Sequence, residues 1–203
     1  MIEFREFAAD YFERFRAVIE RFPKEPLEQA LNLIEGVRTR GGTLWVAGNG
    51  GSAAISDHLV CDATKGTHVH GMPPLRAISL ASNNALLTAL ANDMSYGEVF
   101  RLQLEYYLRP EDAVLLISSS GNSPNVVAAC EAAKAFGVPT LALVGFDGGK
   151  LRGLADVVVW VPVDNYGITE DIHQGIMHCL TQFMRARAEA DSPAAARSVA
   201  RSA

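Results

Sequence analysis

The sequence has few cysteines, no excess of positive charge and no long apolar run, and each shortage excludes a class of protein. Its three cysteines include no CxxC pair, so neither a disulfide framework nor a cysteine-rich metal module is expected. The formal net charge of −5 argues against a basic face for nucleic acid. No uncharged stretch could cross a bilayer, and the N-terminus lacks an apolar signal segment. We therefore expect a cytoplasmic protein that binds neither nucleic acid nor membrane.

The chain of 203 residues begins with two helical patterns. Apolar residues recur every three or four positions over 4–22 and again over 27–37, which predicts two amphipathic helices. The first carries a stripe of Phe and Tyr that needs a surface to bury it. Self-association would supply that surface, and packing within one subunit is the alternative. Residues 1–41 are predicted to form a helical segment for oligomer packing.

From residue 43 onward, short β-branched runs alternate with helical stretches. This alternation is typical of a parallel sheet covered on both faces, and it predicts a three-layer α/β sandwich with five central strands over residues 42–190. A tail at 191–203 is expected to be frayed. The expected strands are 44–47, 77–80, 113–117, 141–144 and 157–161, and the expected helices are 53–63, 84–91, 97–108, 124–136, 149–155 and 169–190.

A glycine-rich loop, residues 48–52, follows the first predicted strand and leads directly into a helix. Backbone N–H groups and the positive end of a helix meet there, which favours an anion. The loop also fits a loose dinucleotide pattern. That pattern requires an acidic residue after the second strand to hold a ribose, whereas Ala81 and Ser82 stand there. A phosphate site without a nucleotide is therefore favoured.

A serine-rich loop, residues 118–123, follows the third predicted strand, and Pro124 is well placed to open the next helix. Four hydroxyl groups surround this helix start, and hydroxyls can bind a phosphate monoester as neutral donors. The loop has no lysine of the kind that nucleoside triphosphate sites use. A plain polar turn is the alternative interpretation.

Two of the predicted helices carry acidic and histidine side chains at spacings that place them on one face of the helix. His58 and Asp62 are four residues apart, and Glu170 and His178 are eight apart. Two imidazoles and two carboxylates would suit zinc or another divalent ion. The alternative is a metal-free site in which the pairs move protons directly. His173 is offset from this stripe, and we expect it to be structural.

The glycine-rich and serine-rich loops resemble the paired loops of SIS sugar-phosphate domains, above all those of phosphoheptose isomerases. The resemblance runs from the first helix to about Ala190, and it includes Asn92-Asp93 and the stretch 147–150. It implies a flavodoxin-like sheet, a homotetramer and a phosphorylated sugar as substrate. The resemblance implies substrate binding by Asn49, Gly50, Gly51, Asn92, Asp93, Ser118, Ser119, Ser120 and Ser123, and Ser52 is expected to bind substrate beside them.

The same resemblance implies the catalytic groups, although two positions depart from the family pattern. The family has Glu where this chain has Asp62, and Gln where it has Glu170. In the family the acid at position 62 is the base and the histidine at position 178 is the acid. Here either Asp62 or Glu170 could be the base, because Asp is one methylene shorter. The expected catalytic residues are Asp62, Glu170 and His178, and the expected zinc ligands are His58, Asp62, Glu170 and His178.

The resemblance further implies an aldose–ketose isomerase that converts sedoheptulose 7-phosphate to D-glycero-D-manno-heptose 7-phosphate through an enediolate. Such a product would feed bacterial surface glycans such as lipopolysaccharide. A non-catalytic SIS binding platform and an isomerase of a different phosphosugar are the alternatives. The set of two histidines and two acids counts against the platform, which would not need it.

Overall fold

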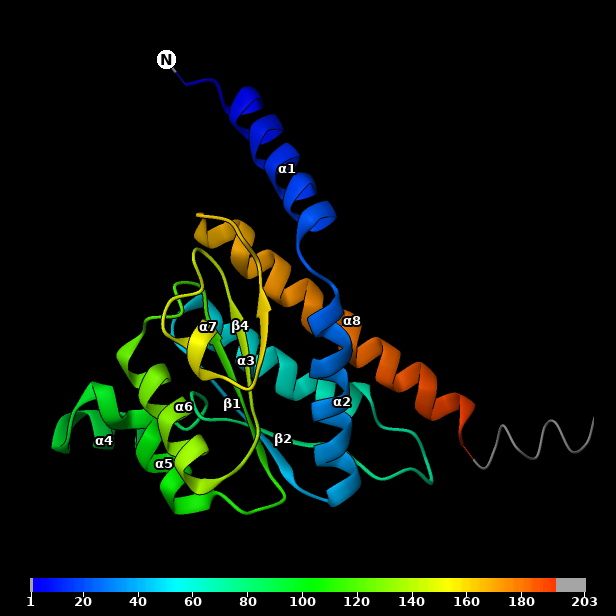
Figure 1. Ribbon diagram of the computed structural model, residues 1–203, viewed down its shortest axis with the longest axis vertical. Helices are drawn as coiled ribbons and strands as arrows, with labels where there is room; N and C mark the ends of the chain where they lie inside the picture. The colour runs from blue at the N-terminus through cyan, green and yellow to red at the C-terminus, as the bar shows by residue number, and fades with distance from the viewer. Residues whose placement is uncertain (1, 193–203) are drawn as a thin grey trace, which may run out of the picture.

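The structure, a computed structural model, describes residues 2–192, so the predicted tail lies outside the described residues except for its first two positions. Two helices open the chain, α1 (Phe4–Arg21) and α2 (Glu25–Arg40). Helix α1 extends away from the body of the molecule and has no buried residue (Figure 1). Helix α2 begins two residues earlier than expected, because Pro26 fits the first helical turn, where no N–H bond is needed.

Five parallel strands form one sheet in the order β2-β1-β3-β4-β5. Strands β1, β3 and β4 lie inside the sheet and are almost wholly buried, which explains their continuous apolar runs. This order is the flavodoxin-like order, so the predicted α/β sandwich is confirmed. The strands are β1 (Thr43–Gly48), β2 (Arg76–Ser79), β3 (Ala113–Ser118), β4 (Thr140–Val144) and β5 (Val157–Trp160).

Helices cover both faces of the sheet, and each face has its own apolar core. One core joins the sheet to α2, α3 and α8, and the other joins it to α5, α6 and α7 (Figure 1). The helix expected at 97–108 is divided into a 3-10 turn, Tyr96–Glu98, and α5. The helices after the first strand are α3 (Gly51–Cys61), α4 (Asn84–Asp93), α5 (Val99–Tyr107), α6 (Pro124–Phe136), α7 (Leu151–Leu154) and α8 (Tyr166–Ala190).

The order of the strands creates a crevice between β1 and β3. These neighbours are in register, with Gly48 opposite Ile117, and their connections leave toward opposite faces of the sheet. Helix α3 begins beyond β1 and packs on one face, whereas α6 begins beyond β3 and packs on the other. Ligands of open α/β sheets bind at such a reversal of strand order, outside the carboxyl ends of the strands. Both loops that the sequence singled out lie there.

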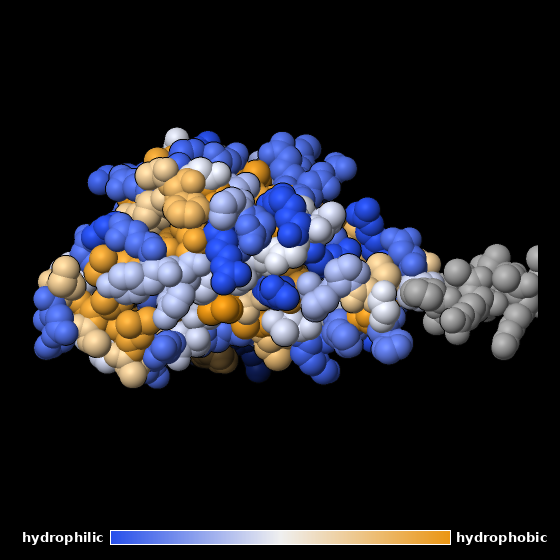
Figure 2. All heavy atoms as spheres, turned by 90° about the horizontal axis from the view of Figure 1, so that it is seen from below, coloured by the Kyte–Doolittle hydropathy of each residue, from blue (hydrophilic) through white to orange (hydrophobic). Residues whose placement is uncertain are grey.

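The exposed surface is mixed in character. Seen from below Figure 1, apolar residues gather on the side where α4 and α5 lie, and hydrophilic residues separate them elsewhere (Figure 2). On α1 the side chains of Phe4, Phe7 and Phe12 are exposed, at 81%, 56% and 67% of their area. No helix among the described residues is long and apolar enough to cross a membrane.

Candidate functional site

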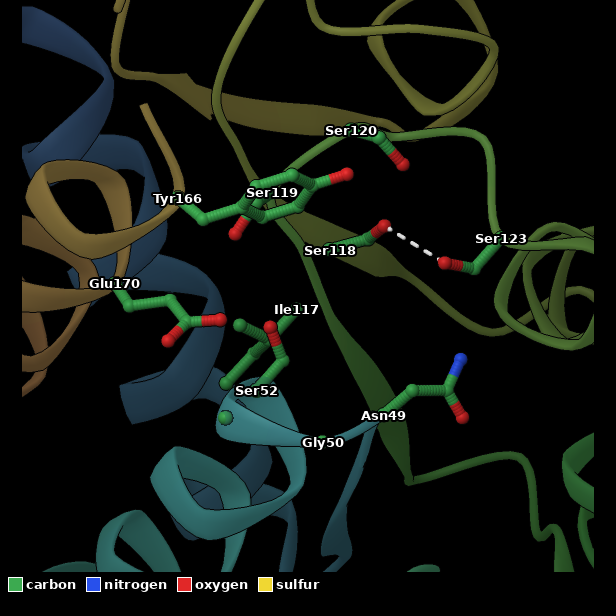
Figure 3. A pocket seen from close by; sticks show the side chains of 11 residues that line it. Asn49, Gly50, Ser52, Ile117, Ser118, Ser119, Ser120, Ser123, Tyr166 and Glu170 are labelled. Atoms are coloured by element: carbon green, nitrogen blue, oxygen red, sulfur yellow. Dashed lines mark hydrogen bonds between the residues drawn. The ribbon is translucent and has the colours of Figure 1, made fainter. Parts of the chain in front are cut away.

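A cavity of about 260 Å³ opens at the carboxyl ends of β1 and β3 (Figure 3). The glycine-rich and serine-rich loops form two of its sides, and the first turns of α8 form another. Neutral donors and a single carboxylate line the cavity, with no lysine or arginine among the described lining residues. These residues are Asn49, Gly50, Gly51, Ser52, Ile117, Ser118, Ser119, Ser120, Ser123, Tyr166 and Glu170.

The glycine-rich loop turns sharply to start α3. Gly50 adopts a φ of 54°, which an L side chain rarely adopts, and it caps the helix. At Gly51 a Cβ atom would fall inside van der Waals contact with the carboxylate of Glu170. Glycine at this position therefore lets an acidic side chain from α8 lie directly over the start of α3.

The serine-rich loop places its hydroxyl groups around the start of α6. Ser118 Oγ accepts from the N–H of Gly121 at 3.2 Å and lies 3.3 Å from Ser123 Oγ. Ser119 differs from them, because its Oγ is buried and has no hydrogen-bond partner among the described residues. A buried hydroxyl without a partner costs free energy, so this group is well prepared for a polar ligand.

The stretch 147–150, together with Leu151 just after it, braces the serine-rich loop from outside. The backbone N–H of Lys150 donates to Asn122 Oδ1 at 3.1 Å, and that of Leu151 donates to the Gly121 carbonyl at 3.1 Å. Gly121 has a φ of 65°, and a Cβ atom there would overlap the carbonyl of Gly148. The family-like stretch therefore shapes the loop through its backbone.

Glu170 lies on the wall opposite Ser123 (Figure 3). It reaches the cavity because α8 begins at Tyr166, three residues earlier than expected, where Asn165 Oδ1 caps the helix by accepting from the N–H of Ile168 at 3.0 Å. Burial raises the pKa of Glu170, and the negative charge of Asp171 raises it further. A carboxylate with a raised pKa in a cavity is suited to accept a proton.

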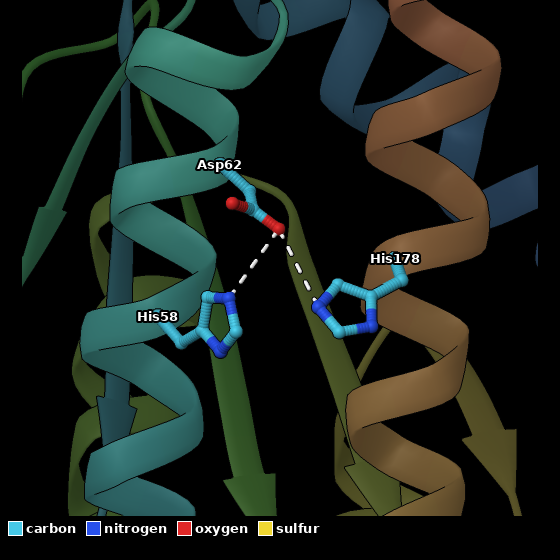
Figure 4. Close-up of side chains that lie close together, drawn as sticks. All are labelled: His58, Asp62 and His178. Atoms are coloured by element: carbon cyan, nitrogen blue, oxygen red, sulfur yellow. Dashed lines mark ion pairs between the residues drawn. The ribbon is translucent and has the colours of Figure 1, made fainter.

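A second cluster lies along the seam between α3 and α8 (Figure 4). Asp62 Oδ2 is 3.7 Å from His58 Nε2 and 3.6 Å from His178 Nε2. One possible ligand atom from each residue lies within 4.8 Å of the others. Two imidazole nitrogens and a carboxylate oxygen are a donor set that suits zinc and similar divalent ions, and all three side chains are partly exposed.

Gln174 joins this cluster, and the sequence analysis missed it. Its amide nitrogen lies 3.0 Å from His58 Nδ1 and 3.0 Å from His178 Nε2. Gln174 therefore links the imidazole on α3 to the imidazole on α8. The sequence spacing could have indicated Gln174, because it stands four residues from Glu170 and four from His178 on one helix face.

The structure brings together most of the predicted residues but in two groups. Glu170 lines the cavity, and eight residues of helix, about 12 Å of rise, separate it from His178. Among the described residues His58, Asp62 and His178 form the close group, and the four-ligand metal site that includes Glu170 stays a prediction. Asn92 and Asp93 lie exposed at the end of α4, where Asn92 Nδ2 donates to Asp93 Oδ1 at 2.8 Å, and they are not among the described lining residues. A sequence motif fixes which residues are available, whereas the packing of α4 and α8 fixes which cavity they reach.

The chain is similar to known proteins along most of its length. The SIS domain family matches residues 10–145. The phosphoheptose isomerase of Chlorobium phaeobacteroides is 46% identical over 154 residues, which are 75% of this chain and 68% of that protein. The phosphoheptose isomerase of Chlorobaculum parvum is 37% identical over 86% of this chain and 84% of its own length.

Solved structures agree with these relatives. The phosphoheptose isomerase of Neisseria gonorrhoeae has a TM-score of 0.84 and 29% identity, covering 91% of this chain and 100% of its own. That of Francisella tularensis has a TM-score of 0.83 and 28% identity over the same shares. The expected family, fold class and isomerase class are therefore confirmed. The chain belongs to the SIS domain family and, within it, to the phosphoheptose isomerases.

Proposed function

We propose that the chain interconverts sedoheptulose 7-phosphate and D-glycero-D-manno-heptose 7-phosphate at the cavity between β1 and β3. The observation that carries this proposal is the pairing of a phosphate-type loop with a carboxylate on the opposite wall. The buried, unpartnered hydroxyl of Ser119 lies on the loop side, and Glu170 lies on the other. Relatives that share 37% to 46% of aligned residues are named for this reaction.

The phosphate would bind at the serine-rich loop. Helices α3 and α6 both begin at the cavity, so their positive ends and free N–H groups favour an anion there. The hydroxyls add neutral donors, among which Ser118, Ser119, Ser120 and Ser123 are the proposed ligands, with Asn49, Gly50, Gly51 and Ser52 from the other loop. Asn92 and Asp93 stay proposed ligands on the resemblance alone.

The length of the sugar then decides where the reacting carbons lie. The phosphate is on C7 and the carbonyl is on C2, at the opposite end of the chain. With phosphate among the serines, C1 and C2 would lie toward α8, the side of Glu170. We therefore assign the base to Glu170, which would take a proton from the carbon next to the carbonyl. Its raised pKa favours that role, since a base works best near the pH of the reaction.

The second cluster, His58, Asp62 and His178, would hold a divalent ion. His58, Asp62 and His178 have the donor chemistry and the mutual closeness that a divalent ion such as zinc requires. Such an ion would polarise the oxygens of the sugar and stabilise negative charge. His178 stays the proposed acid on the resemblance alone, because about 12 Å of helix rise separates it from Glu170. Gln174, which contacts both imidazoles, would help to orient them.

We further propose a homotetramer in the cytoplasm whose product supplies surface glycans, with residues 1–41 forming contacts between subunits around the SIS domain, 42–190. The exposed phenylalanines of α1 support self-association, because a monomer would leave them in water. An apolar groove lies between α1, α2 and α8, and Phe15, Ile19 and Ile176 are among the residues that line it.

The decisive experiment follows solvent deuterium into C1 or C2 of sedoheptulose 7-phosphate by NMR, using protein of known metal content. With Glu170 as the base, Glu170→Gln should lower exchange by about 10²-fold or more; retained exchange in Glu170→Gln together with loss in Asp62→Asn would assign the base to Asp62, as in the family pattern. Asp62→Asn should weaken metal binding, measured by equilibrium dialysis with Zn²⁺. Glu131→Gln, an exposed carboxylate on α6, is the matched control and should change neither quantity. Absence of exchange in the zinc-loaded native protein would refute the proposed reaction.

A further inference from the structure

The side chain of Asn49 is held by two residues from other parts of the chain. Its Nδ2 donates to Asn125 Oδ1 at 2.8 Å, and its Oδ1 accepts from Asn125 Nδ2 at 2.9 Å. The hydroxyl of Tyr96 donates to the same Oδ1 at 2.9 Å. Of these three residues only Asn49 lines the cavity, and Asn125 is 1% exposed at the start of α6.

A count of donors and acceptors shows what remains for a ligand. An amide side chain has two N–H donors and one oxygen with two lone pairs. Asn125 and Tyr96 use both lone pairs of the Asn49 oxygen, and Asn125 also uses one N–H. One N–H of Asn49 is therefore left. In Figure 3 the nitrogen of Asn49 is on the side of the serine-rich loop, and its oxygen points away from that loop.

We propose that Asn125 and Tyr96 are positioning residues that hold the Asn49 amide with one N–H group directed to the ligand as a donor. This inference rests on the proposed function, in which the ligand offers phosphate and sugar oxygens. Turning the Asn49 amide alone would place its N–H groups against those of Asn125 and its oxygen against an oxygen. Because Asn125 is buried, water cannot relieve that mismatch.

The same arrangement links three segments at the cavity. Asn49 belongs to the glycine-rich loop, Asn125 to the helix that follows the serine-rich loop, and Tyr96 to the turn just after Asn92-Asp93. The hydroxyl of Tyr96 therefore links the turn that follows α4 to the glycine-rich loop. Tyr96 is 55% exposed and Asn125 is buried. A substitution of Tyr96 should therefore disturb folding less than one of Asn125.

The test is a set of variants whose affinity for sedoheptulose 7-phosphate and for inorganic phosphate is measured by calorimetry. Tyr96→Phe keeps the ring and removes only the hydroxyl, and should weaken sedoheptulose 7-phosphate binding about five-fold with thermal stability unchanged. Asn125→Asp cannot donate to the Asn49 oxygen and should weaken binding by about ten-fold or more. Tyr106→Phe, another exposed tyrosine, is the control and should bind as the native protein does.

A double-mutant cycle with Asn49→Ala separates positioning from other effects. If Asn125 and Tyr96 act through Asn49, their substitutions should have no further effect on affinity in the Asn49→Ala background. Equal losses with and without Asn49 would overturn the inference, and so would a Tyr96→Phe protein that binds like the native one. If the native protein binds the phosphosugar but does not isomerise it, only the proposed reaction fails. The positioning inference is then still tested, because the double-mutant cycle uses affinities and not rates. If the native protein binds neither probe, the positioning inference falls too.

Discussion

Lowering the pH from 7 to 5 should destabilise the protein through one buried side chain, His173. This imidazole lies on α8 with no exposed area, and neither ring nitrogen has a hydrogen-bond partner of good geometry among the described residues. Burial lowers the pKa of His173 from its ordinary 6.5 to about 4, and the nearby Val144 backbone opposes this shift without offsetting it. The folded protein therefore resists a proton that the unfolded chain accepts.

The sign and size of the effect follow from proton linkage. Above pH 6.5 the imidazole is neutral in both states, and its contribution to stability is complete. As the pH falls from 6.5 toward 4, the unfolded chain binds more protons than the folded one, so stability is lost. From pH 7 to pH 5 the loss is about 2 kcal/mol, and below pH 4 it approaches about 3 kcal/mol. Against a typical stability of about 5 to 15 kcal/mol, this change is easily measured.

The assay is urea unfolding at pH 7, 6 and 5 at one fixed protein concentration. Native protein should lose about 2 kcal/mol more over this range than His173→Leu or His173→Gln, neither of which can titrate there. The raised pKa of Glu170 acts in the opposite direction, stabilising the fold as the pH falls, but it is common to all the proteins and cancels. His68→Leu, at an exposed histidine, is the control. Equal pH dependence in native protein and both His173 variants would refute the reasoning.

Two further predictions concern packing and reactivity. Gly121→Ala should destabilise the fold by about 3 kcal/mol, because the site combines a positive φ with a backbone carbonyl in the space of the new methyl group. Gly153→Ala, which meets nothing, should change the thermal midpoint little. Burial raises the pKa of Cys130 to about 11, so a thiol reagent at pH 8 should leave it unmodified in folded protein and modify it in urea. Mass mapping that finds Cys130 modified without urea would contradict this.

Much of the fold could be read from local patterns. Continuous apolar runs in β1, β3 and β4 indicate strands buried on both faces, and turn residues mark their ends. Because the carboxyl ends of parallel strands share one edge of a sheet, two loops after two such strands were good candidates for one site. The glycine-rich and serine-rich loops meet for this reason, and their residue types already indicated an anion.

Only the tertiary structure decided which distant side chains touch. Asn49 and Asn125 are 76 residues apart, and no periodicity relates them. Gln174 reaches both imidazoles because α8 packs along α3, whereas the sequence offered only a shared helix face. The same packing brings Glu170 into the cavity over Gly51. Spacing along a helix fixes direction, but the distance between side chains on different elements depends on packing, which one sequence does not reveal.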